Sequence, residues 1–108
     1  MSRHTPALPT IVQALLDEVW LDLDELCRAA GVAPRWVDER VAEGLLQARP
    51  LGPGGAWRFD AAALRRVRCM ARMERDFDAV PELAALVADL EDEIATLRAA
   101  LACARRGV

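Results

Sequence analysis

The sequence predicts a mainly α-helical protein that carries a small β hairpin and ends in a long helix suited to pairing two copies of the chain. Two short helical patterns with capping signals stand close together between residues 21 and 44. A run rich in proline and glycine, residues 50–55, cannot be helical and precedes a short alternating stretch. Aliphatic residues then recur every three or four positions toward the end of the chain.

The first helix is expected to begin at Leu23. Asp22 can cap it, and Glu25, three residues later, can reach back to the Asp22 amide as in a capping box. Gly31 supplies the positive φ that commonly ends a helix, and Pro34 fits the first position of a second helix. Two helices joined by a tight turn and followed by a hairpin have the outline of a winged helix-turn-helix.

The glycine-rich loop is followed by an alternating strand at residues 56–59 and by a third helix. Asp60 is expected to cap that helix, which continues to about Glu74. Residues 76–80 are expected to form a linker, because the residue before Pro81 is disfavoured in helical dihedrals. Short apolar runs at residues 11–21 fit an N-terminal strand that pairs near Trp57, with a short helix as the competing prediction for residues 11–16.

These elements divide the chain into three parts. We expect a tail and strand lead-in at residues 1–20, a winged helix-turn-helix domain at 21–75, and a linker with a dimerisation helix at 76–108. The last helix carries an apolar seam whose members alternate at spacings of four and three, as a and d positions of a heptad do: Leu83, Val87, Leu90, Ile94, Leu97 and Leu101. A helix packed only within its own chain would look similar, but the strict seam favours a coiled-coil-like homodimer.

The composition and the spacing of reactive residues exclude several classes of function. No apolar run approaches the roughly 20 residues that span a bilayer, and the start of the chain lacks an apolar signal core, so we expect a cytoplasmic protein with no membrane contact. Cys27, Cys69 and Cys103 are too few and too far apart for a zinc motif. The one histidine, His4, has no nucleophile or orienting partner in view, and no phosphate-binding loop precedes a helix. We therefore expect a binding protein rather than an enzyme, without metal or cofactor.

The order ELCRAAG in the first helix, EGLL after the second and WRFD after the loop resembles the winged helix-turn-helix of MerR-type proteins. More narrowly, the chain is similar to the chaperone-modulator (CbpM-like) family. Its WRFD is close to that family's W-x-F-D, and RDFDAVPEL at residues 75–83 looks like that family's linker. The resemblance covers about residues 21–101. It implies a homodimer that binds the J-domain of a DnaJ-like co-chaperone and blocks the use of that J-domain by Hsp70.

The second helix departs from the DNA-binding pattern. DNA-binding MerR proteins typically carry an arginine and two tyrosines before the EGL, whereas this chain reads DERVA at residues 38–42. Carboxylates that face the groove of a duplex are repelled by its phosphates. J-domains present a basic helix, so the resemblance favours an acidic partner-binding surface. A helix face that is merely solvated would have the same pattern of charges. The expected partner-binding residues are Asp22, Asp24, Glu25, Trp36, Asp38, Glu39 and Glu43.

Arginines gather in the middle of the chain, and they support an alternative. A DNA-binding regulator of MerR type would use the wing and third helix through Arg49, Arg58, Arg65 and Arg66. The less specific interpretation is a solvated face in which arginines pair with nearby carboxylates such as Glu74. A third possibility is a dimerising adaptor with a different partner.

Overall fold

The computed structural model describes residues 20–50 and 55–107. The chain divides into two compact units, Met1–Arg68 and Cys69–Val108, and each is described by itself. The strand or helix expected at residues 11–16, and His4, lie outside the described residues.

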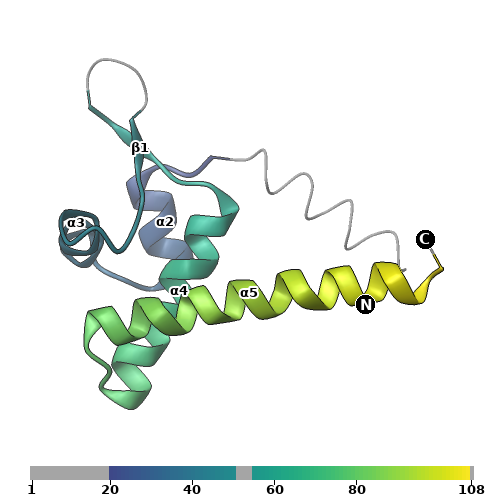
Figure 1. Ribbon diagram of the computed structural model, residues 1–108. Helices are drawn as coiled ribbons and strands as arrows, with labels where there is room; N and C mark the ends of the chain where they lie inside the picture. The colour runs from purple at the N-terminus through teal and green to yellow at the C-terminus, as the bar shows by residue number, and fades with distance from the viewer. Residues whose placement is uncertain (1–19, 51–54, 108) are drawn as a thin grey trace, which may run out of the picture. The chain divides into compact units, whose positions relative to one another are not determined.

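The first unit begins with α2, Leu23–Ala30, and both of its ends follow the predicted chemistry (Figure 1). The Glu25 amide donates to the Asp22 carboxylate at 2.8 Å, and the Asp22 amide donates to the Glu25 carboxylate at 2.8 Å. This reciprocal pair is the predicted capping box. Gly31 follows in the left-handed region with φ 72°, and its amide donates to the Cys27 carbonyl. A short turn then leads to α3, Pro34–Ala42, which starts at the predicted proline.

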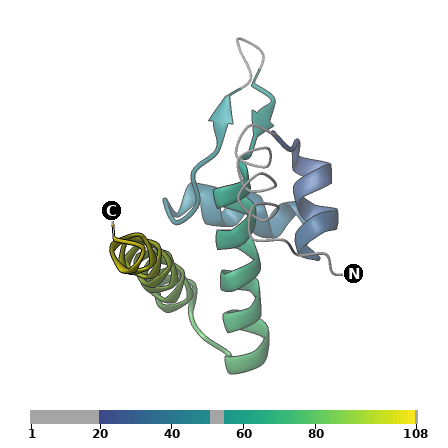
Figure 2. The same ribbon diagram turned by 90° about the vertical axis from the view of Figure 1, so that its right-hand side faces the viewer.

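The wing is a two-stranded antiparallel sheet of β1, Arg49–Pro50, and β2, Trp57–Arg58. The two strands lie side by side and extend away from α2 and α3 (Figures 1 and 2). Leu21 and Phe59 exchange backbone hydrogen bonds of 2.8 Å in an isolated antiparallel bridge. The predicted pairing of the chain before α2 with the wing is therefore present at Leu21.

Phe59 leads from the wing into the core of the first unit. It is 1% exposed and belongs to a cluster that joins α2, α3, the turn after α3 and the first part of α4: Leu26, Cys27, Val37, Leu46, Phe59 and Val67. Burial of these side chains supplies the main stabilisation of the unit. Asp60 then accepts the Ala63 amide at 2.8 Å, so the predicted cap of the third helix is confirmed.

That third helix is α4, Ala61–Phe77, and it ends three residues beyond the predicted Glu74. The expectation that the linker begins at residue 76 is therefore wrong by two residues. The conformational restriction before proline acts only on Val80, and the helix is instead interrupted at Asp78, whose φ is 55°. The last helix, α5, runs over Pro81–Arg105 and restarts at the predicted proline.

Small residues join α4 and α5 within the second unit. Ala84, Ala85 and Ala88 are buried on α5, and Met70 and Ala71 are buried on α4. An ion pair of 3.2 Å connects Arg72 on α4 with Glu91 on α5. The alanine face, rather than the leucine face, is therefore the side of α5 that the second unit buries. In the described part of the chain, no helix is long and apolar enough to cross a membrane.

Candidate protein-docking surfaces

Charged side chains cover the outward face of α3. Arg35, Asp38 and Glu39 are exposed. Together with the cap residue Glu43, the helix carries three carboxylates against two arginines, which gives a net charge of −1. In a helix-turn-helix the second helix is the one that meets DNA, so its negative charge is unfavourable for contact with phosphates.

The two arginines of α3 lie beside carboxylates. Arg40 is 7% exposed, its guanidinium stacks 4.8 Å from the centre of the Trp36 ring, and its Nη1 lies 3.3 Å from the Glu43 carboxylate. Arg35 Nε lies 3.4 Å from the Glu39 carboxylate. Among the described residues, no arginine forms an ion pair with Asp38. Asp38 therefore carries the acidic charge that this helix presents outward.

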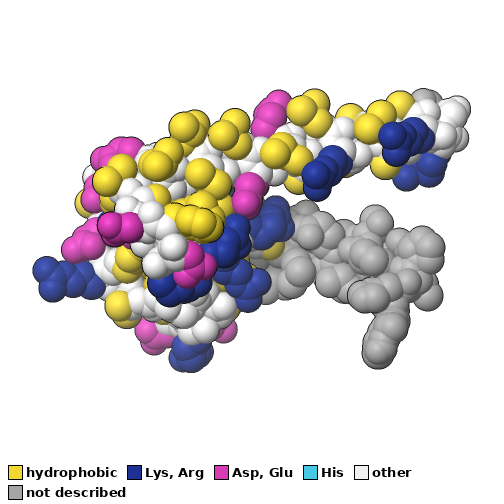
Figure 3. Space-filling model, turned by 90° about the horizontal axis from the view of Figure 1, so that it is seen from below, with side chains coloured by type: hydrophobic (Ala, Val, Ile, Leu, Met, Phe, Trp, Pro, Cys, Tyr) yellow, Lys and Arg dark blue, Asp and Glu magenta, His cyan; other side chains and the backbone are white. Residues whose placement is uncertain are grey.

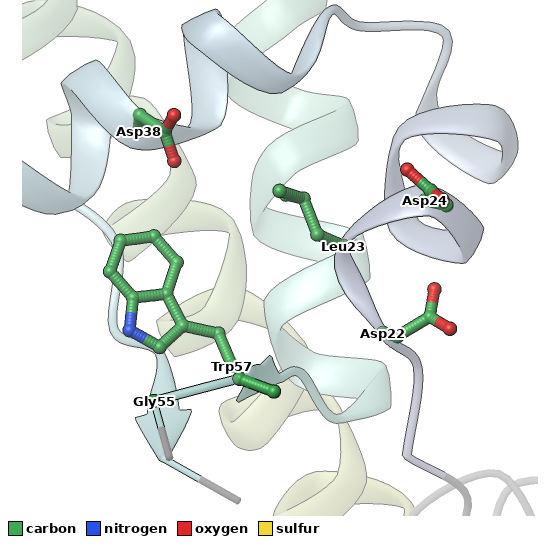
Figure 4. Close-up of a pocket in the computed structure, with 7 residues that line it drawn as sticks. Asp22, Leu23, Asp24, Asp38, Gly55 and Trp57 are labelled. Atoms are coloured by element: carbon green, nitrogen blue, oxygen red, sulfur yellow. The ribbon is translucent and has the colours of Figure 1, made fainter.

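A groove opens beside Asp38, between the start of α2, α3 and the wing. Figure 4 shows Leu23 between Asp38 on one side and Asp22 and Asp24 on the other, with the Trp57 ring reaching below Asp38. The side chains of Leu23 and Trp57 are half-buried, whereas the three aspartates are exposed. The groove is lined by Asp22, Leu23, Asp24, Asp38, Gly55, Ala56 and Trp57.

Burial and the carboxylates on both sides of this groove raise the pKa of one buried thiol, that of Cys27. Burial raises the pKa of Cys27 above its usual value, and the negative charges of Asp24 and Asp38 raise it further. Asp24 belongs to α2 and Asp38 to α3. Their fields therefore overlap between the two helices, and a cationic side chain placed in the groove would be attracted from both sides.

The seven predicted partner-binding residues thus separate into three sets. Asp22, Asp24 and Asp38 line the groove. The carboxylate of Glu25 accepts the Asp22 amide within the capping box. The remaining three belong to the cluster around Arg40, and these are Trp36, Glu39 and Glu43.

Sequence reasoning missed the apolar residues of the groove. The sequence indicates Leu23 as the start of the first helix and Trp57 as part of the alternating strand, and neither position by itself indicates a groove. Both pack against the core while one side of each stays accessible. Strand alternation puts Trp57 on the same face as buried Phe59, so the sequence pattern alone gave no signal that one side of the Trp57 ring stays accessible.

The arginines of the alternative are mostly held within the first unit. Arg49 and Arg58 face each other across the wing. The Arg49 guanidinium lies 5.6 Å from the centre of the Trp20 ring, and the Arg58 guanidinium lies 4.5 Å from it. Arg66 donates through Nε to the Leu45 carbonyl at 2.7 Å and so braces the turn after α3. Arg65 is exposed on α4. Arg49 and Arg58 are therefore tied to Trp20 and Arg66 to the turn after α3, while Arg65 is exposed.

An apolar stripe forms a second surface, along α5. Figure 3 shows hydrophobic side chains along most of the length of this helix, at the top of the view. Each side chain of the stripe is 47–59% exposed: Leu83, Leu86, Leu90, Ile94, Leu97 and Leu101. The predicted seam shares five of these residues but has Val87 in place of Leu86. Val87 is half-buried because it borders the alanine face.

A family model described as MerR HTH family regulatory protein matches residues 21–106. This match supports the wider of the two resemblances, while membership of the narrower chaperone-modulator family stays a prediction. No curated protein matches the chain. In the described residues, no three His, Cys, Asp or Glu side chains gather as the ligands of a metal ion would.

Proposed function

The chain belongs to the MerR HTH family of regulatory proteins, and we propose that it is a protein-binding member of that family. In this proposal it binds the J-domain of a DnaJ-like co-chaperone through the acidic surface of its helix-turn-helix. Binding keeps the J-domain from Hsp70, so the protein acts as a non-catalytic, cytoplasmic inhibitor of the co-chaperone.

The observation that carries the proposal is the charge of α3. The helix that would read DNA presents Asp38 outward, and its buried arginine is stacked on Trp36 and paired with Glu43. A duplex would bring phosphates against this carboxylate and would find no exposed arginine other than Arg35 on the helix. A basic protein helix would instead meet a surface of opposite charge.

Charge complementarity also explains how such an inhibitor competes. The resemblance to chaperone modulators implies a J-domain partner, and J-domains offer a basic helix to Hsp70. An acidic surface that covers this helix would occupy the same side chains that Hsp70 needs. Complementary charges raise the association rate and favour the correct partner over others.

The apolar stripe of α5 supports a homodimer. Six aliphatic side chains in one line, each about half exposed, are unusual on a surface that meets only water. From Glu91 to Arg105 every described side chain of α5 is exposed, so the second unit by itself leaves this half of the helix largely uncovered. An isolated helical segment of about 15 residues is only marginally stable in water unless its apolar face is covered. A second copy of the chain offers the same stripe and would cover it.

The alternative is a DNA-binding regulator. Family membership and the two wing arginines, Arg49 and Arg58, support it. A dimer of this kind would bind a twofold-symmetric operator, with an affinity that falls steeply as salt rises. The acidic α3 counts against it.

Calorimetry with the isolated J-domain tests the proposal. Replacing Asp38 and Glu39 by lysine reverses the charge of α3, and we expect the dissociation constant to rise by about tenfold or more. The control variant Glu82→Lys with Asp92→Lys makes the same change of net charge on α5. The unmodified protein should also suppress the J-domain-stimulated ATPase activity of Hsp70. An α3 variant that binds and inhibits as well as the unmodified protein would exclude this surface.

A further inference from the structure

We infer that the groove between α2, α3 and the wing, rather than the cluster around Arg40, is the place where the J-domain docks. The inference rests on the proposed function and adds the chemistry of the ligand. The groove takes one aliphatic side chain from a helix of the J-domain, and basic side chains on either side of it reach the aspartates at the edges of the groove.

The floor of the groove is apolar and firmly supported. Leu23 and Trp57 each pack with one side against the core cluster and remain half-buried. The Trp57 ring also meets the buried Phe59 ring edge-on, with the ring centres 6.4 Å apart. A large aromatic ring held in this way loses little conformational freedom when a ligand covers it, which is typical of residues that contribute most to protein interfaces.

The edges of the groove are acidic on both sides. Asp22 and Asp24 stand at the start of α2, and Asp38 stands on α3 (Figure 4). The backbone at Asp22 is fixed because its amide and its carboxylate take part in the capping box. Because Asp22 and Asp24 line the groove from the α2 side and Asp38 lines it from the α3 side, negative charges flank the groove on both edges. A basic residue on each side of an aliphatic one satisfies this arrangement.

On the wing side of the groove, Gly55 and Ala56 are exposed, and a Cβ atom built on Gly55 meets no described atom within 4 Å. Among the described residues, this side therefore leaves room for an incoming side chain. In the cluster around Arg40, by contrast, Glu39 and Glu43 already pair with the Arg40 guanidinium, which stacks on Trp36.

Two matched pairs of variants test the groove with the isolated J-domain as the probe. Asp38→Lys and Glu39→Lys change the charge equally on adjacent residues of α3, but only Asp38 lines the groove. We expect Asp38→Lys to weaken binding about tenfold and Glu39→Lys about two- to threefold, as an interface charge and a peripheral charge do. Ala56→Trp, which fills the groove from an exposed position, should also weaken binding, whereas Ala62→Trp on exposed α4 surface should not.

Nuclear magnetic resonance supplies a readout that does not depend on altered residues. The indole N–H signals of Trp57 and Trp36 report the groove and the Arg40 cluster separately, and we expect the J-domain to shift the Trp57 signal most. Equal losses in Asp38→Lys and Glu39→Lys, with a shift of Trp36 rather than Trp57, would overturn the groove while leaving J-domain binding intact. No binding by the unmodified dimer would overturn both the groove and the proposed function.

Discussion

Replacing Leu90 and Ile94 by alanine should dissociate the homodimer. These two residues lie at the middle of the apolar stripe, where they are 53% and 47% exposed within one chain. Fully burying such a side chain contributes about 1.5–3 kcal/mol, so covering the exposed half contributes about 1 kcal/mol. A dimer loses four of these side chains in the double variant, which amounts to about 4 kcal/mol. The dimer dissociation constant should therefore rise by about a thousandfold.

Sedimentation equilibrium over a wide range of protein concentration measures this change directly. Alanine is the best helix former, so the substitutions themselves should not lower the helix propensity of α5. Circular dichroism at a concentration where both proteins are dimeric provides the check. The matched control is Asp92→Ala with Thr96→Ala, which alters two exposed residues on the side of α5 away from the stripe.

Two results would refute the reasoning. An unmodified chain that stays monomeric at high concentration would show that the stripe does not pair two copies. A double variant that dissociates no more readily than the control would show that a dimer forms through another surface.

Four further predictions concern Cys69, the cap of α4 and the core. Burial, with help from neighbouring Glu91, raises the pKa of Cys69 from 9.0 to about 11, so this thiol should react slowly with a thiol reagent at pH 8 while exposed Cys103 reacts fast. Because the folded pKa is the higher one, the free energy of unfolding should fall as pH rises from 9 to about 11, and Cys69→Ala should reduce that fall in denaturant titrations. Removing the cap of α4 by Asp60→Ala should cost about 1 kcal/mol of stability, whereas Asp60→Asn should retain most of it, as thermal unfolding can show. Phe59→Ala should cost about 3–5 kcal/mol in the same assay, and a cost near zero would contradict the described core.

The features that the sequence predicted well depend on neighbours in the chain. The capping box joins Asp22 with Glu25, and the cap of α4 joins Asp60 with Ala63, so each needs residues only three apart. The starts of two helices follow from Pro34 and Pro81 in the same way. Local backbone chemistry of this kind is independent of how the units pack.

The groove could not be predicted, because it needs three separate segments to meet. Asp22 and Asp24 come from α2, Asp38 from α3 and Trp57 from the wing, and no periodicity in the sequence connects them. The burial of Arg40 was equally hidden. Its spacings from Trp36 and Glu43 place the three side chains on one side of the helix, but only the packing of α3 buries Arg40.

The seam of α5 shows a second limit of prediction from the sequence. A strict heptad selects Val87, whereas the exposed stripe passes through Leu86. Leu86 and Val87 border the same helical face. Which of the two is exposed depends on how the buried alanines of α5 face α4. The sequence pattern therefore predicted that an apolar face exists but not its edges.

Light scattering on the protein mixed with the J-domain of its own cell's DnaJ-like co-chaperone, at near-physiological salt, tests the central claim most directly. The account predicts a dimer whose mass rises on mixing by that of the bound J-domain, and a mixture with Asp38→Lys that shows a smaller rise. A dimer whose mass is unchanged by the J-domain, but which binds promoter fragments with a steep dependence on salt, would contradict the account and favour the DNA-binding alternative.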